Sequence, residues 1–147
     1  MKHTISPPPL PPVMLVEDEP ALREILTFML EDLGAVVTSF ATAAEGLAAL
    51  GAHDWALVLT DVRTPGPVDG LALATTARAR LPAAGVIVMS GFYEEMGRPL
   101  PMGVSFLPKP WPSESFDQLV KPVLEQFSKR MYPEQGVTGS GLVRWRQ

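Results

Sequence analysis

The stretch VMLVEDEP, from Val13 to Pro20, joins a continuous apolar run to three acids and a proline. Four consecutive apolar residues predict a strand that is buried on both faces of a sheet. Glu17 and Asp18 then stand side by side at the rim of the expected core, where two carboxylates repel each other and resist the loss of water. Another group in the chain must therefore compensate them.

The segment after Pro20 has a helical pattern, because apolar residues recur in steps of three and one between Leu22 and Leu33. Proline suits the first turn of a helix, and Gly34 suits its end. The same alternation of strand and helix continues along the chain. We predict strands at 13–16, 36–40, 55–60, 85–90 and within 104–110, and helices at about 20–33, 42–50, 71–81 and from 113 or 115 onward.

Proline and glycine mark the exceptions to this alternation. Residues 91–103 are rich in both, so we expect the fourth helix to be short or disordered. Pro122 lies inside the last predicted helix and predicts a kink or an early break. We predict that residues 1–12 form a proline-rich extension and that residues 131–147 form a disordered tail. Residues 13–130 are then the folded domain.

The order of the predicted elements is typical of an α/β protein with a doubly wound parallel sheet. A length of 147 residues suits one domain, and the absence of cysteine excludes disulfides and thiolate metal sites. The net charge of −4 argues against nucleic-acid binding, and no apolar run is long enough to span a membrane. We therefore expect a cytoplasmic protein that binds neither nucleic acid nor a membrane.

Polar side chains stand at the ends of four predicted strands. Glu17 and Asp18 follow the first strand, Asp61 follows the third, Ser90 ends the fourth and Lys109 follows the fifth. Each residue alone is ordinary in a cap, turn or loop. In a doubly wound sheet, however, the carboxyl ends of the strands share one edge, where ligands bind. The set therefore predicts one site with three carboxylates, a hydroxyl and an ammonium.

The carboxylates of this set indicate a magnesium site. Clustered carboxylates without thiols or a histidine cluster are hard oxygen ligands, which suit Mg²⁺. The ion would relieve their repulsion and polarise a phosphoryl group. A carboxylate can then act as a nucleophile and form an acyl phosphate, while Lys109 pairs with phosphate oxygens and Ser90 donates a hydrogen bond.

Four motifs in the chain resemble the receiver domains of response regulators in two-component signalling. They are LVEDEP at 15–20, LVLTDVRTPGPVDG at 57–70, VIVMSG at 86–91 and FLPKP at 106–110, and the resemblance extends from residue 13 to about 130. It implies a flavodoxin-like (βα)5 fold with strand order 2-1-3-4-5. It also implies a phosphoacceptor that assists its own phosphorylation and dephosphorylation but is not an enzyme. Its phosphodonor would be a histidine kinase or a histidine phosphotransfer protein, and its output would be protein–protein contact with an unknown target.

The resemblance implies a role for each polar residue at the strand ends. Asp61 is expected to be the phosphoacceptor, and Lys109 is expected to pair with the phosphate. Mg²⁺ is expected to bind Asp18 directly, Glu17 through water, Asp61, and the backbone carbonyl of Arg63.

Two further residues are expected to report phosphorylation to a partner. Ser90 resembles the switch hydroxyl of the family and Phe106 the switch aromatic, although core packing explains Phe106 equally well. The Lys109–Pro110 bond is similar to one that is cis in the family. A bulky Phe92 is expected to shield the phosphate from water, because its position influences hydrolysis in the family.

The chain departs from the family pattern in two places. The loop between Asp61 and Gly70 is slightly longer than usual, and the stretch between Ser90 and Lys109 is shorter. We expect residues 91–103 to be mobile until phosphorylation or a partner orders them. No output domain is recognisable after the last predicted helix, so we expect a stand-alone regulator.

Three other interpretations use similar residues. An enzyme of the haloacid dehalogenase type normally has a second aspartate two residues after its nucleophile, where this chain has Arg63. A flavodoxin-like cofactor binder needs a loop rich in hydroxyls and glycine after the first strand, where this chain has acids. A pseudo-receiver that binds partners without phosphorylation is the main alternative.

Overall fold

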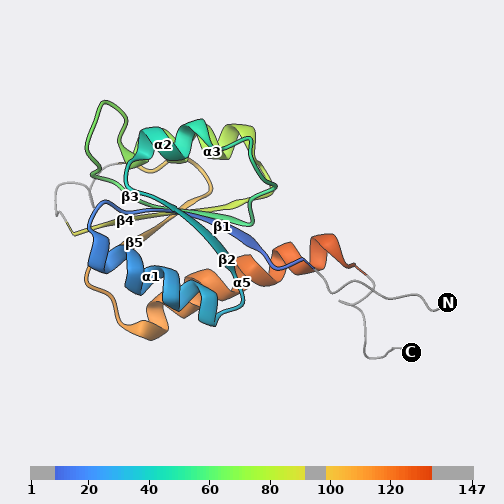
Figure 1. Ribbon diagram of the computed structural model, residues 1–147. Coiled ribbons are helices and arrows are strands. Elements are labelled where there is room, and N and C mark those ends of the chain that lie inside the picture. The colour runs from blue at the N-terminus through green and yellow to red at the C-terminus, as the bar shows by residue number, and fades with distance from the viewer. Residues whose placement is uncertain (1–8, 92–98, 134–147) are drawn as a thin grey trace.

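The computed structural model describes residues 9–91 and 99–133. Its strands are β1 (Pro12–Val16), β2 (Val36–Phe40), β3 (Leu57–Asp61), β4 (Gly85–Ser90) and β5 (Val104–Pro108), and its helices are α1 (Pro20–Asp32), α2 (Ala43–Ala48), α3 (Gly70–Arg80) and α5 (Ser113–Met131). The strands form one parallel sheet in the order β2-β1-β3-β4-β5 (Figure 1). The predicted doubly wound fold and its strand order are therefore confirmed.

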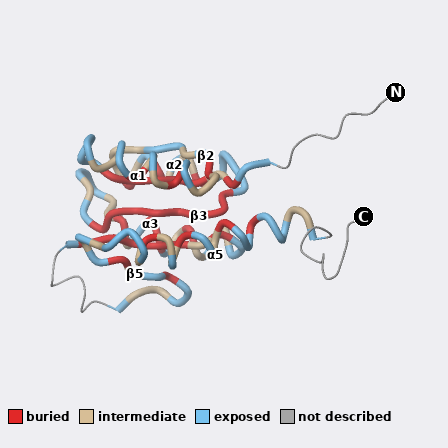
Figure 2. Tube along the Cα trace, turned by 90° about the horizontal axis from the view of Figure 1, so that it is seen from below, coloured by how far each residue is buried: buried red, intermediate tan, exposed pale blue. Residues whose placement is uncertain are grey.

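Two hydrophobic layers lie on the two faces of the sheet. Residues Val13–Val16 of β1 are fully buried, and alternate residues of a strand point to opposite faces. Val13 and Leu15 pack with α1 and α5, whereas Met14 and Val16 pack on the side of α2 and α3. Strand β3 is also buried along its whole length (Figure 2). Burial on both faces explains why these strands are continuous apolar runs in the sequence.

Side chains cap the N-termini of the first two helices, α1 and α2. The carboxylate of Glu19 accepts the backbone N–H of Leu22 at 2.8 Å, and Pro20 occupies the first turn of α1 as predicted. Thr42 and Glu45 form a capping box at the start of α2. These bonds satisfy N–H groups that have no partner within the helix. The acid-bearing turn between β1 and α1 is therefore anchored at its far end.

The predicted early break at Pro122 is wrong, because α5 continues through this residue to Met131. Pro122 cannot donate to the carbonyl of Gln118, but both residues lie on the exposed side of the helix. Water can therefore bind the carbonyl that loses its partner. The opposite side of α5 buries an apolar stripe that packs against the sheet and holds the helix together. This stripe consists of Phe116, Val120, Leu124 and Phe127.

Several predictions fall on residues that the structure does not describe. The predicted short fourth helix, the shielding role of Phe92 and the mobility of 91–103 fall wholly or mainly on 92–98. Most of the proline-rich extension and of the tail falls on 1–8 and 134–147. Within 9–91 and 99–133, no helix is both long enough and apolar enough to cross a membrane.

Candidate functional site at the carboxyl ends of the strands

The register of the sheet brings the acidic residues together. Val16 of β1 lies opposite Thr60 of β3, so the next residues, Glu17 and Asp61, emerge at the same level of the sheet. Parallel strands run in one direction, and their carboxyl ends therefore share one edge. The predicted neighbourhood of these two acids follows directly from this pairing.

Three carboxylates and one ammonium form the centre of the site. Glu17, Asp18 and Asp61 each offer an oxygen atom within 4.8 Å of the others. The Nζ atom of Lys109 lies 3.0 Å from Oε1 of Glu17 and 2.9 Å from Oδ2 of Asp61. The structure thus places all four residues at one edge, where the sequence predicted them.

Unequal burial and Lys109 together accommodate the adjacent acids Glu17 and Asp18. Glu17 is 1% exposed, whereas Asp18 is exposed to solvent and keeps its hydration. The Glu17 carboxylate accepts hydrogen bonds from Lys109 and, at 3.1 Å, from the backbone N–H of Glu19. Burial nevertheless dominates and raises the pKa of Glu17 above its ordinary value. A second positive charge at this edge would therefore stabilise the ionised site.

Lys109 stays charged between its two acidic partners. Partial burial by itself would lower the pKa of Lys109, but the hydrogen bonds to Asp61 and Glu17 outweigh this effect and raise it. The backbone N–H of Lys109 donates to the carbonyl of Ser90 at 2.9 Å, which fixes the residue beside the end of β4. The Lys109 side chain is therefore cationic at neutral pH, where its ammonium faces Asp61.

The start of α3 packs directly on the backbone of Asp61. A Cβ atom at Gly70 would collide with the carbonyl oxygen of Asp61, and it would lie only 2.9 Å from the Cα atom of Val62. Asp69 caps α3 by accepting the N–H of Ala72 at 2.9 Å. From the sequence alone, Gly70 is predicted only as the end of a loop. The adjacent Asp and Gly at a helix start were the available signal for this close approach.

We expect Gly70→Ala to lower the free energy of unfolding of the metal-free protein by about 2 kcal/mol, because the added methyl group must push α3 away from β3. Urea denaturation measures this change. Gly51→Ala is the matched control, since a Cβ atom there would meet only the end of the Arg80 side chain at 4.0 Å. Equal stability of the two variants would contradict the proposed close approach.

The two predicted switch residues lie on neighbouring strands and on one face of the sheet. Ser90 ends β4 and is fully buried. Phe106 of β5 lies opposite Val88, which precedes Ser90 by two residues and therefore shares its face. Phe106 is half-buried against the core on the side of α2 and α3. The Lys109–Pro110 bond is cis, as the resemblance implied.

The carboxylate cluster suits a divalent cation. Glu17, Asp18 and Asp61 supply hard oxygen donors, and one ammonium does not balance three carboxylates. Arg63, whose backbone carbonyl is the further predicted ligand, is exposed in the loop that follows β3. Its part in binding a metal stays a prediction.

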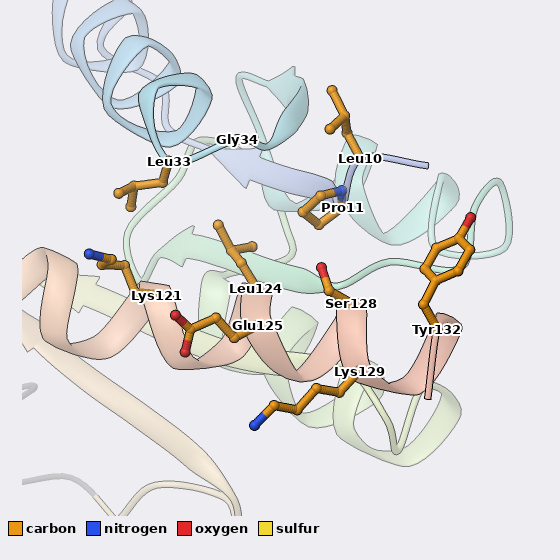
Figure 3. A pocket seen from close by; sticks show the side chains of 10 residues that line it. All are labelled: Leu10, Pro11, Leu33, Gly34, Lys121, Leu124, Glu125, Ser128, Lys129 and Tyr132. Atoms are coloured by element: carbon orange, nitrogen blue, oxygen red, sulfur yellow. The ribbon is translucent and has the colours of Figure 1, made fainter. Parts of the chain in front are cut away.

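Two hollows lie near the sheet ends. A groove of about 460 Å³ is lined by Pro11, Leu33 and Leu124, among others (Figure 3). Because Pro11 precedes β1 and Leu33 follows α1, this groove lies at the opposite end of the sheet from the carboxylates. The second hollow, of about 640 Å³, adjoins Lys109 and Trp111. Of these two hollows, the second borders the candidate site, because Lys109 lines it.

Comparison with known proteins identifies relatives of most of the chain. Residues 13–121 match the family model of the response regulator receiver domain. The transcriptional regulatory protein FixJ of Azorhizobium caulinodans is 42% identical over 80 residues, covering 54% of this chain and 37% of FixJ. The C4-dicarboxylate transport transcriptional regulatory protein DctD of Rhizobium meliloti is 34% identical over 128 residues, covering 82% and 26%. The chain thus spans less than two fifths of either relative.

A solved structure has the same fold. The response regulator protein TrrA of Thermotoga maritima, in complex with Mg²⁺-BeF, superposes with a TM-score of 0.70 at 22% identity. The match covers 78% of this chain and 99% of the TrrA chain. The family-model match over most of the chain, supported by this shared fold, shows that the protein belongs to the response regulator receiver domain family.

Proposed function

We propose that Asp61 accepts a phosphoryl group from a phosphorylated histidine of a histidine kinase or a histidine phosphotransfer protein, in a reaction that depends on Mg²⁺. Receiver domains are signalling modules of response regulators and take part in phosphoacceptor signalling. The observation that carries the proposal is the contact of the Lys109 ammonium with Asp61 and Glu17, beside Asp18. This arrangement combines a nucleophile, a cation and metal ligands at one edge.

The proposed transfer exchanges a P–N bond for a P–O bond. A carboxylate oxygen of Asp61 bonds to phosphorus, and the ring nitrogen of the donor histidine leaves with the electron pair of the broken bond. Lys109, 2.9 Å from Oδ2 of Asp61, can pair with an oxygen of the transferred group. Phosphoryl transfer depends mainly on positioning and charge stabilisation, which a fixed ammonium supplies.

The carboxylates of Glu17, Asp18 and Asp61, with the backbone carbonyl of Arg63, would hold Mg²⁺. When bound, the ion supplies positive charge that offsets the carboxylates and polarises the phosphoryl group. The chemistry of the oxygen donors supports this assignment. The complex of TrrA with Mg²⁺-BeF supports it by analogy of fold.

Phosphorylation would reach a partner protein through Ser90 and Phe106. The Ser90 hydroxyl would donate a hydrogen bond to a phosphoryl oxygen, and Phe106 would move with it, because both residues lie on one face of adjacent strands. That the chain binds no nucleic acid stays a prediction, because the relatives are named as transcriptional regulators and the chain spans only part of them.

The test is incubation of the chain with acetyl phosphate, followed by intact-mass measurement. We expect the mass of one phosphoryl group to be added with Mg²⁺ and none with a chelator, because the metal offsets the negative charge of the acceptor. A phosphorylated histidine phosphotransfer protein then replaces acetyl phosphate to test the proposed donor. Failure to gain mass from either donor with Mg²⁺ would instead favour the pseudo-receiver alternative.

A further inference from the structure

The hydroxyl of Thr64 connects the loop after β3 to the start of α2. Its Oγ1 atom accepts the backbone N–H of Ala43 at 3.1 Å and donates to the carbonyl of Val68 at 3.2 Å. Ala43 is the first residue of α2, where N–H groups have no partner within the helix. One half-buried hydroxyl therefore closes the loop on itself and joins it to a helix 21 positions away.

Two prolines limit the hydrogen bonds that the tip of the loop can donate. Its tip contains Pro65 and Pro67, which have no N–H to donate, and residues 65–67 are exposed. Its two ends are fixed by backbone bonds, from the N–H of Val62 to Met89 at 2.9 Å and from the N–H of Gly70 to Val62 at 2.7 Å. The Thr64 hydroxyl thus anchors the part of the loop between these ends.

The position of Thr64 matters because its peptide bond carries the carbonyl of Arg63. The peptide unit is planar, so the Arg63 carbonyl and the N and Cα atoms of Thr64 lie close to one plane. Fixing the side chain of Thr64 on α2 and Val68 restricts rotation of this plane. The direction of the Arg63 carbonyl is thereby restricted as well.

We propose that Thr64 is a positioning residue that orients the Arg63 carbonyl toward the metal site through its hydrogen bonds to Ala43 and Val68. This inference rests on the proposed function, because it assumes that the Arg63 carbonyl binds Mg²⁺ beside the three carboxylates. The rigid link makes metal affinity depend on a hydroxyl that touches neither metal nor phosphate. Loss of groups that orient metal ligands typically weakens metal affinity by roughly 10–100-fold.

The test compares the Mg²⁺ dissociation constants of four variants by calorimetry, at a temperature where thermal unfolding shows each to be folded. Thr64→Val removes the hydroxyl and keeps the shape, and we expect about tenfold weaker binding. Thr64→Ser keeps the hydroxyl and should bind within about twofold of the unmodified chain. Thr64→Ala also lacks the hydroxyl and replaces Thr64→Val if the latter does not fold. Thr75→Val is the control, because the Thr75 hydroxyl donates only within α3, to Leu71 at 2.9 Å.

Two results would overturn the inference and can be told apart. If the unmodified chain binds no Mg²⁺, the proposed metal site fails and the role of Thr64 fails with it. If the unmodified chain binds Mg²⁺ and the variants without the Thr64 hydroxyl bind it equally well, only the role of Thr64 fails. A purely structural role would lower the unfolding temperature of Thr64→Val without changing its Mg²⁺ affinity while folded.

Discussion

Asp61→Asn is expected to abolish phosphoryl uptake and to leave the fold intact. The amide has nearly the shape of the carboxylate but is a poor nucleophile, so no acyl phosphate can form at this position. Lys109 keeps its contact with Glu17 at 3.0 Å, so neither buried charge is left without a partner. Intact mass after incubation with acetyl phosphate and Mg²⁺ measures uptake, and circular dichroism checks the fold.

The matched control for this prediction is Asp32→Asn, at the exposed end of α1. This variant should gain one phosphoryl group at the rate of the unmodified chain, because Asp32 lies outside the carboxylate cluster. Retention of a full phosphoryl group by Asp61→Asn would show that another residue is the acceptor. Loss of uptake in both variants would instead point to a general effect of charge.

Lys109→Met should impair both stability and phosphoryl transfer. Removing the ammonium leaves the buried carboxylate of Glu17 facing Asp61 with no cation between them. In the absence of metal, we expect this change to lower the free energy of unfolding by about 3 kcal/mol. Mg²⁺ should restore part of this loss by supplying positive charge at the same edge. The rate of phosphoryl uptake should fall roughly 100-fold, as it does when a group that stabilises transition-state charge is removed.

The pH dependence of this effect follows from the direction of the Lys109 shift. The pKa of Lys109 is raised in the folded chain, so its stabilising contribution is fully present below the ordinary value of 10.5. It is lost as pH rises through the higher pKa of the folded state. Urea denaturation of the unmodified chain and of Lys109→Met should therefore show different free energies of unfolding at neutral pH. This difference should disappear in strong alkali. Lys121→Met, on the exposed side of α5, is the control, and a comparable loss of stability in it would contradict the assignment to Lys109.

The local pattern of the sequence predicted most of the elements. The strands are short continuous apolar runs because the sheet is covered on both faces, and this pattern is visible without coordinates. The start of α2 was predictable because the Thr42–Glu45 box is a contact between neighbours along the chain. Pro122 was misjudged because its effect depends on which side of α5 faces the core, a property of packing.

The residues of the site were predictable by type, because a parallel sheet places all its strand ends at one edge. Their pairings were not predictable. Lys109 contacts Glu17 and Asp61, which lie 92 and 48 positions away along the chain. Whether residues so far apart in the sequence come within hydrogen-bond distance depends on the register of the strands. The roles of Gly70 and Thr64 were less clearly indicated by the sequence. Gly70 matters because the backbone of Asp61 approaches it in space, and Thr64 matters because the start of α2 does.

The sequence by itself thus determined the alternation of strands and helices, the caps, and the chemistry of the groups at the strand ends, because each depends on residues close together along the chain. Only the tertiary structure decided that Glu17 is buried while its neighbour Asp18 is exposed, and that one ammonium serves two carboxylates. Burial and charge pairing depend on how separate segments pack, and local sequence does not encode that arrangement.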